Sequence, residues 1–113
     1  MTIPGPFIVY FGWDSDDLDQ AAMDTLAAAA SAFREFGIAR IVAVGHADTS
    51  GPDDYNQDLS MRRAQSVQGA LETLGIAASA MNLEARGERD NRVPTGDGVR
   101  EQQNRNVEIT LVE

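Results

Sequence analysis

The residues with the greatest potential for ligand chemistry lie between Asp48 and Arg63. Asp48 stands in a loop bounded by two glycines, and this loop directly follows the apolar run 41–44. Asn56 and Arg63 are seven residues apart and therefore share one face of the helix expected there. An aspartate accepts hydrogen bonds from an ammonium group, a guanidinium holds a carboxylate through two parallel bonds, and an amide fixes orientation. Together these residues have the chemistry to bind a small zwitterion.

Each of these residues also has a purely structural explanation. Asp48 could equally cap its own loop or the helix that follows, because aspartates favour both positions. Arg63 could be a solvated surface charge, and this is the role we expect for Arg62, which points about 100° away on the helix. If Arg63 instead holds a ligand, its replacement by alanine should abolish binding with little loss of fold.

A catalytic site is not expected. His46 is the only histidine and lies two residues before Asp48, on the same side of an extended chain. A His–Asp pair can act as a general base, but neither Ser50 nor Ser60 lies in a nucleophile motif such as G-x-S-x-G. There is no cysteine, P-loop, dinucleotide fingerprint or calcium loop. We therefore expect no enzyme activity, no metal and no cofactor, and a histidine that packs or hydrogen-bonds at the strand end.

The composition restricts the class of partner. A chain of 113 residues can form one core but not two. Its net charge of −9 argues against nucleic acid or an anionic membrane surface, which require a cationic footprint. An acidic ligand must therefore be held by a local arginine. The N-terminus lacks the basic and apolar regions of a signal peptide, so any export signal is expected to lie outside this sequence.

The apolar patterning predicts four strands and two helices in the order β-α-β-α-β-β. The expected strands cover residues 7–11, 41–44, 79–87 and 106–112. Asp17 and Gln20 form a plausible capping box for the first helix, which Gly37 ends; Pro52 begins the second helix and Gly75 ends it. This order implies an α/β two-layer sandwich in which a mixed sheet of about four strands packs on the helices.

This architecture places polar residues at strand ends, where α/β folds commonly bind ligands. Asp48 follows a buried strand, the polar segment 88–98 is an expected loop, and Glu88, Asn104 and Arg105 flank other strand ends. Arg105 has two possible roles. It could strengthen the capture of a carboxylate, or it could bridge the loop to Glu88.

The loop and helix between residues 45 and 64 resemble the signature of the OmpA-like peptidoglycan-binding family, G-H-T-D-x-x-G-x-x-x-Y-N-x-x-L-S-x-x-R-A. Every signature position matches except the threonine, which is Ala47. The resemblance extends over roughly residues 7–112. It implies that residues 1–113 form a single OmpA-like domain.

Three shorter segments carry the resemblance further. Residues 11–15 are similar to the F-D-x-[DN]-x ending of the family's first strand, with Gly12 in place of the aspartate. Residues 85–88 resemble its G-x-G-E turn with the first glycine replaced, and residues 104–109 resemble its closing N-R-R-V-E-I segment. Asn106 stands where the second arginine of that segment is expected, which leaves one candidate cation fewer.

Domains of that family bind peptidoglycan non-covalently through the meso-diaminopimelate of its stem peptide. Carried over residue by residue, the resemblance assigns ligand contacts to Asp48, Arg63, Asn56, Asp14, Thr49 and Ser50, with Arg105 in support. Asp48 would meet the ammonium and Arg63 the carboxylate of diaminopimelate, while Thr49 and Ser50 would offer backbone groups of the loop.

The resemblance implies a non-catalytic domain of the periplasm, associated with the outer membrane and the cell wall, that anchors an envelope protein to peptidoglycan. The alternative is a docking or dimerisation module with the same fold, as in the motility-stator relatives. That alternative predicts an envelope protein or a second copy of the chain as the partner.

Overall fold

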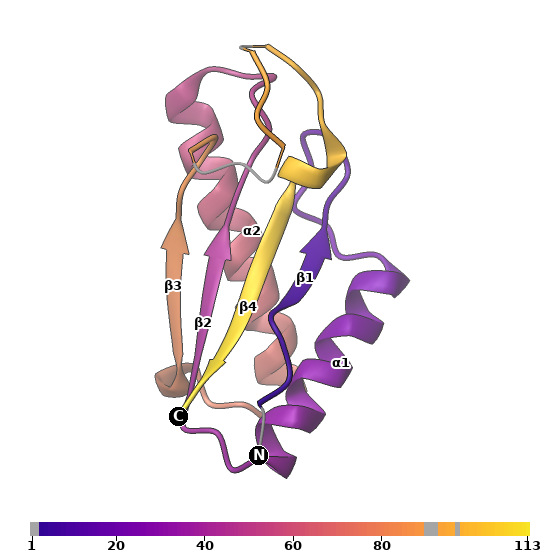
Figure 1. Ribbon diagram of the computed structural model, residues 1–113, viewed down its shortest axis with the longest axis vertical. Helices are drawn as coiled ribbons and strands as arrows, with labels where there is room; N and C mark the ends of the chain where they lie inside the picture. Colours follow the sequence, from indigo (N-terminus) through magenta and orange to yellow (C-terminus); the bar gives the residue numbers. More distant parts are fainter. Residues whose placement is uncertain (1–2, 90–92, 97) are drawn as a thin grey trace.

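The computed structural model describes residues 3–89, 93–96 and 98–113. A four-stranded sheet is covered on one face by two helices (Figure 1). The strands are β1 (Phe7–Tyr10), β2 (Arg40–Gly45), β3 (Met81–Ala85) and β4 (Asn106–Val112). The helices are α1 (Gln20–Glu35) and α2 (Asp53–Thr73), with 3₁₀ turns at Ala78–Ala80 and Gln102–Asn104.

The strands are ordered β1-β4-β2-β3, with β2 and β3 parallel and the other pairs antiparallel. Helix α2 forms the crossover that the parallel pair requires. The last strand, β4, inserts between β1 and β2, so that Val107 lies opposite Val9 on one side and Gly45 on the other. The predicted α/β two-layer sandwich with a mixed four-stranded sheet is confirmed.

The core lies between the sheet and the helices. Strand β4 buries Val107, Ile109 and Leu111 on the helix side and exposes Thr110 and Val112, as its alternating sequence predicts. The fully buried residues that surround them include Val9, Leu26, Ile41, Val67 and Leu71. Burying one such side chain stabilises the fold by roughly 1.5–3 kcal/mol.

Helix α1 begins two residues later than its predicted capping box. Its N-cap is Asp19, whose side chain accepts a hydrogen bond of 2.8 Å from the amide of Ala22. The amide of Asp17 instead donates to the hydroxyl of Ser15 at 3.0 Å, which holds Asp17 in the preceding turn. The predicted capping box of Asp17 and Gln20 is therefore wrong, because the local bond to Ser15 competes with capping at Asp17 and Asp19 caps the helix instead.

Strand β3 is shorter than the predicted strand 79–87. Its first residues form a 3₁₀ turn, and the chain turns out of the sheet before Gly87, which has a φ of 57°. The described residues of the expected loop 88–98 contain no helix or strand. Residues 90–92 and 97 of that loop lie outside the described residues.

A close backbone contact sets the position of the loop that carries Asp48. Gly45 ends β2 directly over α2, and a Cβ atom at Gly45 would lie 1.9 Å from the carbonyl oxygen of Ser60. Only glycine permits this approach. The loop after β2 consequently lies against the N-terminal half of α2, at the end of the sheet where the connections after β1 and β3 also gather (Figure 1).

Candidate functional site

A small pocket of about 40 Å³ lies at this end of the sheet. It is lined by Trp13, Asp14, Asp48, Ser50, Gly51, Tyr55, Asn56, Leu59 and Arg63. The fold therefore brings together most of the residues that the sequence singled out. They come from three segments that are far apart in the chain: the connection between β1 and α1, the loop after β2, and α2.

Asp48 is 3% exposed, and its carboxylate accepts four hydrogen bonds from protein donors. Oδ1 accepts from the amide and the hydroxyl of Ser50, and Oδ2 accepts from the amide of Glu101 and, at 2.9 Å, from Nη1 of Arg105. Burial by itself would raise the pKa of Asp48, but the bonds from Ser50, Arg105 and Glu101 outweigh it and lower that pKa below its ordinary value. Asp48 is thus an anion at neutral pH, and it caps its own loop.

Arg63 is 1% exposed, so the interpretation of this residue as a solvated surface charge is wrong. Its guanidinium donates to three backbone carbonyl groups: Nε to Ser15 at 2.8 Å, Nη1 to His46 at 3.0 Å, and Nη2 to Gly12 at 3.1 Å. The plane of the guanidinium also lies 5.3 Å from the ring centroid of Phe11. Arg63 therefore joins the segment after β1 to the loop after β2, a structural role that helical spacing alone did not reveal.

Burial also affects the charge state of Arg63. It lowers the pKa of Arg63 to about 10, against the opposing effect of Asp48. The residue therefore remains charged at neutral pH. A guanidinium has five N–H groups, and the three bonds to carbonyl groups leave one N–H on each terminal nitrogen for the pocket.

Arg105 lies behind Asp48 and does not line the pocket. Besides its bond to Asp48, it donates from Nε to the carbonyl of Phe11 at 3.1 Å. The predicted bridge from Arg105 to Glu88 is wrong, because Glu88 instead accepts a hydrogen bond of 3.0 Å from Nδ2 of Asn56. Arg105 is thus the ion-pair partner of Asp48, which neither sequence-based alternative foresaw.

Asn56 is 3% exposed, and both N–H groups of its side-chain amide donate to other protein groups. Nδ2 donates to the carbonyl of Gly51 and to the carboxylate of Glu88, both at 3.0 Å. With both N–H groups used, the remaining group that Asn56 can offer to a ligand is the acceptor Oδ1. Asn56 could therefore help to hold an ammonium group.

Thr49 faces away from the pocket. Its hydroxyl donates to the carbonyl of Gly96 at 2.7 Å and accepts from the amide of Val99 at 3.0 Å. Its carbonyl accepts from the amide of Gly98 at 2.7 Å. In this structure Thr49 holds the connection between β3 and β4 against the loop after β2, and it does not line the pocket with Asp48.

Two side-chain bridges close the mouth of the pocket. Nε1 of Trp13 donates to Oγ of Ser50 at 3.0 Å, and the hydroxyl of Tyr55 donates to the carboxylate of Asp14. A volume of about 40 Å³ admits only a few water molecules. A larger ligand therefore requires both bridges to open.

Trp13 and Tyr55 are pocket residues that the sequence reasoning did not assign. Both are large side chains that remain exposed, by 48% and 40%. The signals in the sequence were the chain's only tryptophan and the tyrosine beside Asn56. Their position at the mouth depends on three segments meeting in space, which no local pattern encodes.

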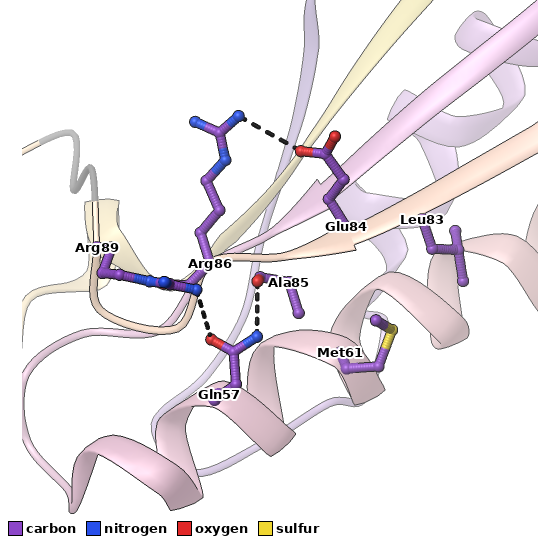
Figure 2. A pocket seen from close by; sticks show the side chains of 7 residues that line it. All are labelled: Gln57, Met61, Leu83, Glu84, Ala85, Arg86 and Arg89. Atoms are coloured by element: carbon purple, nitrogen blue, oxygen red, sulfur yellow. Dashed lines mark hydrogen bonds and ion pairs between the residues drawn. The ribbon is translucent and has the colours of Figure 1, made fainter.

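A larger groove of about 500 Å³ runs along β3 and carries different chemistry (Figure 2). It is lined by Gln57, Met61, Leu83, Glu84, Ala85, Arg86 and Arg89. Figure 2 shows that its arginines contact the groove's own polar residues: Arg86 pairs with Glu84 at 3.3 Å, and Arg89 donates to Gln57 at 3.2 Å. The groove contains none of the residues that the sequence assigned to a ligand.

Residues 3–89, 93–96 and 98–113 contain no group of three or more histidine, cysteine, aspartate or glutamate side chains arranged to hold a metal ion. Within the same ranges, neither helix has the length and apolarity needed to cross a membrane.

The structure is an α/β sandwich domain with a small polar pocket at one end of its sheet, and comparison with known proteins gives its family. A model described as the OmpA family matches residues 10–105, so the chain belongs to the OmpA family. It is 41% identical over 111 residues to an outer membrane protein of Gluconacetobacter diazotrophicus, covering 93% of this chain and 29% of that protein. It is 38% identical over 101 residues to the peptidoglycan-associated lipoprotein of Pseudomonas aeruginosa, covering 88% of this chain and 59% of that protein.

Solved structures agree with this assignment. The peptidoglycan-associated lipoprotein of Burkholderia pseudomallei superposes with a TM-score of 0.81 at 26% identity, covering 90% of this chain and 86% of that one. The cell wall anchor of the T6SS from Pseudomonas aeruginosa superposes with a TM-score of 0.71 at 26% identity, covering 90% and 73%. The OmpA-like domain of FopA1 from Francisella tularensis shares the fold, with a TM-score of 0.82 at 23% identity over 90% and 68%.

The chain is shorter than the curated relatives it matches. It spans 29% of the outer membrane protein, 48% of the probable lipoprotein YiaD of Escherichia coli and 59% of the peptidoglycan-associated lipoprotein of Pseudomonas aeruginosa. The shared part corresponds to the domain described above. The functions of those longer proteins are therefore not assigned directly to this chain.

Proposed function

We propose that this domain binds peptidoglycan non-covalently, through the diaminopimelate of the stem peptide, and thereby anchors an envelope protein to the cell wall. The observation that carries the proposal is one pocket lined by both an ionised Asp48 and a charged Arg63. Relatives named as peptidoglycan-associated lipoproteins and a structural neighbour named as a cell wall anchor support it.

The hydrogen bonds of the pocket suggest how an ammonium group enters. The hydroxyl of Ser50 links Trp13 to Oδ1 of Asp48. A hydroxyl rotates readily, so the ammonium can take its place on Asp48 once the hydroxyl of Ser50 turns away from the carboxylate. Oδ1 of Asn56 offers a second acceptor. Because the ammonium replaces a neutral donor by a charged one, the exchange strengthens the bond to the carboxylate.

The carboxylate of the same diaminopimelate end would meet Arg63. The guanidinium retains one N–H on each terminal nitrogen, and two such groups suit a carboxylate. Arg63 needs no movement to do this, because its three backbone bonds hold it in place. A zwitterion adds no net charge to the pocket, which fits a site where one anion and one cation are already buried.

In this proposal the domain binds peptidoglycan in the cell envelope and does not cleave it. The names of the relatives, which include an outer membrane protein and peptidoglycan-associated lipoproteins, support a location at the wall and outer membrane. The pocket lining, as described, offers carboxylates, hydroxyls and a guanidinium but no histidine as a base for either hydroxyl. Anchoring requires only affinity.

A direct test is sedimentation of the domain with purified diaminopimelate-type sacculi. The wild-type chain should co-sediment, and Asp48→Asn should do so more weakly, because a neutral amide supplies no charge to an ammonium. Asp24→Asn is the matched control, since Asp24 is an exposed residue of α1 outside the pocket. Failure of the wild-type chain to bind sacculi would reject the proposed function.

The second candidate function is docking to an envelope protein or to a second copy of the chain. Its supporting observation is the 500 Å³ groove beside β3, which lies at an edge of the sheet (Figure 2). Edge strands present unpaired backbone groups that another chain can use. Sedimentation equilibrium of the domain alone tests self-association, and a dimer that forms without wall peptides would favour this candidate.

A further inference from the structure

Arg100, which has no carboxylate partner among the residues that the structure describes, is held beside the pocket. Cζ of Arg100 lies 3.6 Å from the centroid of the Trp13 ring, close enough for a cation–π contact. Trp13 is itself held in place through its Nε1 bond to Ser50, which in turn contacts Asp48. Arg100 is therefore connected to Asp48 through only two intervening side chains.

The charge of Arg100 is available for a ligand. Among the described residues, Arg62 and Arg105 form ion pairs with aspartates, whereas Arg100 forms none. Arg100 is exposed, and the protein around it has a net charge of −9. When a guanidinium stacks face-on over an aromatic ring, its N–H groups point outward in the plane of the stack. Trp13 thus presents an oriented cation beside the pocket.

We propose that Arg100, positioned by Trp13, binds a second carboxylate of the wall peptide, namely the free α-carboxylate of the glutamate that precedes diaminopimelate. This inference rests on the proposed function of the pocket. The pocket takes the far end of the diaminopimelate side chain, so in an extended peptide the glutamate carboxylate lies roughly 10–12 Å from that end. Trp13 lies 3.0 Å from Ser50 and 3.6 Å from Arg100, and the separation across its indole ring is within this reach.

The proposal predicts a preference that the diaminopimelate pocket alone cannot produce. Wall peptides occur with this glutamate carboxylate either free or amidated, and the two forms have the same diaminopimelate end. An amide offers a guanidinium no negative charge, so the free form should bind more tightly. Because Arg100 is exposed, we expect a preference of about three- to tenfold.

The experiment uses two synthetic tripeptides, alanyl-γ-glutamyl-diaminopimelate and its isoglutamine counterpart. Their affinities are measured by calorimetry and by the emission of Trp13, the only tryptophan in the chain. The wild-type domain should prefer the glutamate form, and Arg100→Gln should bind both forms with the lower affinity. Arg40→Gln is the matched control. It removes the same charge from the opposite end of β2, so the preference should persist.

A further variant separates stacking from charge. Trp13→Phe keeps an aromatic ring for Arg100 and should keep most of the preference, whereas Trp13→Leu should lose it. The readout is the ratio of the two affinities by calorimetry, because removal of a pocket residue changes both of them. Equal binding of the two peptides by the wild-type domain, or an unchanged preference in Arg100→Gln, would overturn the role of Arg100 and leave the proposed function standing. Binding of neither peptide would overturn both.

Discussion

Asp48 and Arg105, which are 57 residues apart in the chain, form an ion pair of 2.9 Å between Oδ2 and Nη1. The pair exists because β4 lies between β1 and β2 and so brings its preceding residue beside the end of β2. Since Arg105 also donates to the carbonyl of Phe11, one guanidinium ties two strand ends together. A cationic ligand would therefore bind an aspartate that already forms an ion pair with Arg105.

Arg105→Gln should destabilise the domain, because it leaves the buried Asp48 without its cation. Hydrogen bonds to charged groups contribute about 1.5–3 kcal/mol each, and a loss of this size is expected in the free energy of unfolding. Urea denaturation followed by circular dichroism measures it. Arg40→Gln, an exposed change at the far end of β2, should alter the stability by less than about 0.5 kcal/mol. Equal stability of both variants would mean that the pair is not stabilising.

Acid should weaken the fold in a way that depends on Asp48. The folded state lowers the pKa of Asp48, so the unfolded chain takes up a proton on this residue before the folded one does. The stabilisation is therefore complete above the ordinary aspartate pKa of about 3.9, and it is lost as the pH falls through the lower folded value. The free energy of unfolding measured from pH 6 downward should fall less steeply in Asp48→Asn. Identical pH profiles would assign the acid sensitivity to other groups.

Binding should respond to the same protonation. A protonated Asp48 no longer attracts an ammonium, so the affinity for muropeptides should decrease on acidification wherever Asp48 becomes neutral. Calorimetric titrations of wild type and Asp48→Asn at matched pH values test this. Equal acid sensitivity of the two proteins would contradict the assignment of the ammonium to Asp48.

Arg63→Ala should unfold or strongly destabilise the domain, in contrast to the expectation from sequence that its removal leaves the fold intact. The change empties a buried volume and leaves the carbonyl groups of Gly12, Ser15 and His46 without their donor. A loss of roughly 3–5 kcal/mol is expected, which is a large part of the stability of a small domain. Thermal unfolding is the measurement.

The neighbouring arginine is a suitable control for that variant. Arg62 is 39% exposed and pairs with Asp16 and Asp58 at the surface. Surface ion pairs contribute about 0–1 kcal/mol, so Arg62→Ala should remain close to wild type. Comparable losses in the two variants would show that Arg63 is not a buried clamp. Because Arg63→Ala confounds folding with binding, it is a probe of stability, and binding by Asp48→Asn is compared with wild type under conditions where circular dichroism shows both proteins folded.

Tyr55→Phe should let the pocket open more easily. The variant keeps the aromatic ring and removes the hydroxyl that bridges to Asp14. The bond is accepted by a carboxylate but is exposed to solvent, so it contributes about 0.5–1.5 kcal/mol, and the association rate of a diaminopimelate peptide should rise by roughly two- to tenfold. Stopped-flow measurement of Trp13 emission reports the rate. An unchanged rate would mean that this bridge does not limit entry.

Diaminopimelate-type wall peptides should bind more tightly than lysine-type peptides. A lysine end still offers an ammonium to Asp48, but it lacks the carboxylate proposed for Arg63. A preference on the order of 10- to 100-fold is expected, at the scale of one charged hydrogen bond in a partly open site. Calorimetry with matched muropeptides measures it. Indistinguishable affinities would favour the docking function instead.

Local patterns in the sequence were sufficient for most of the secondary structure. The alternation of residues 106–112 predicted β4 with the bounds observed, because a period of two depends only on which face of the strand is buried. Gly37 and Gly75 marked the ends of both helices correctly, since each has a positive φ there. The errors at Asp17 and at strand 79–87 arose where neighbouring residues offered competing turns.

The sequence by itself determined which residues could serve a zwitterion, because Asn56 and Arg63 carry the required groups at helical spacing and Asp48 lies in the loop just before that helix. Only the tertiary structure decided how each is used. It paired Asp48 with Arg105, buried Arg63 among backbone carbonyls, and brought Trp13 over the pocket. These contacts join residues that are 17 to 57 positions apart in the chain. Periodicity reports only which face of an element is buried, whereas such partnerships depend on how the strands are ordered in the sheet.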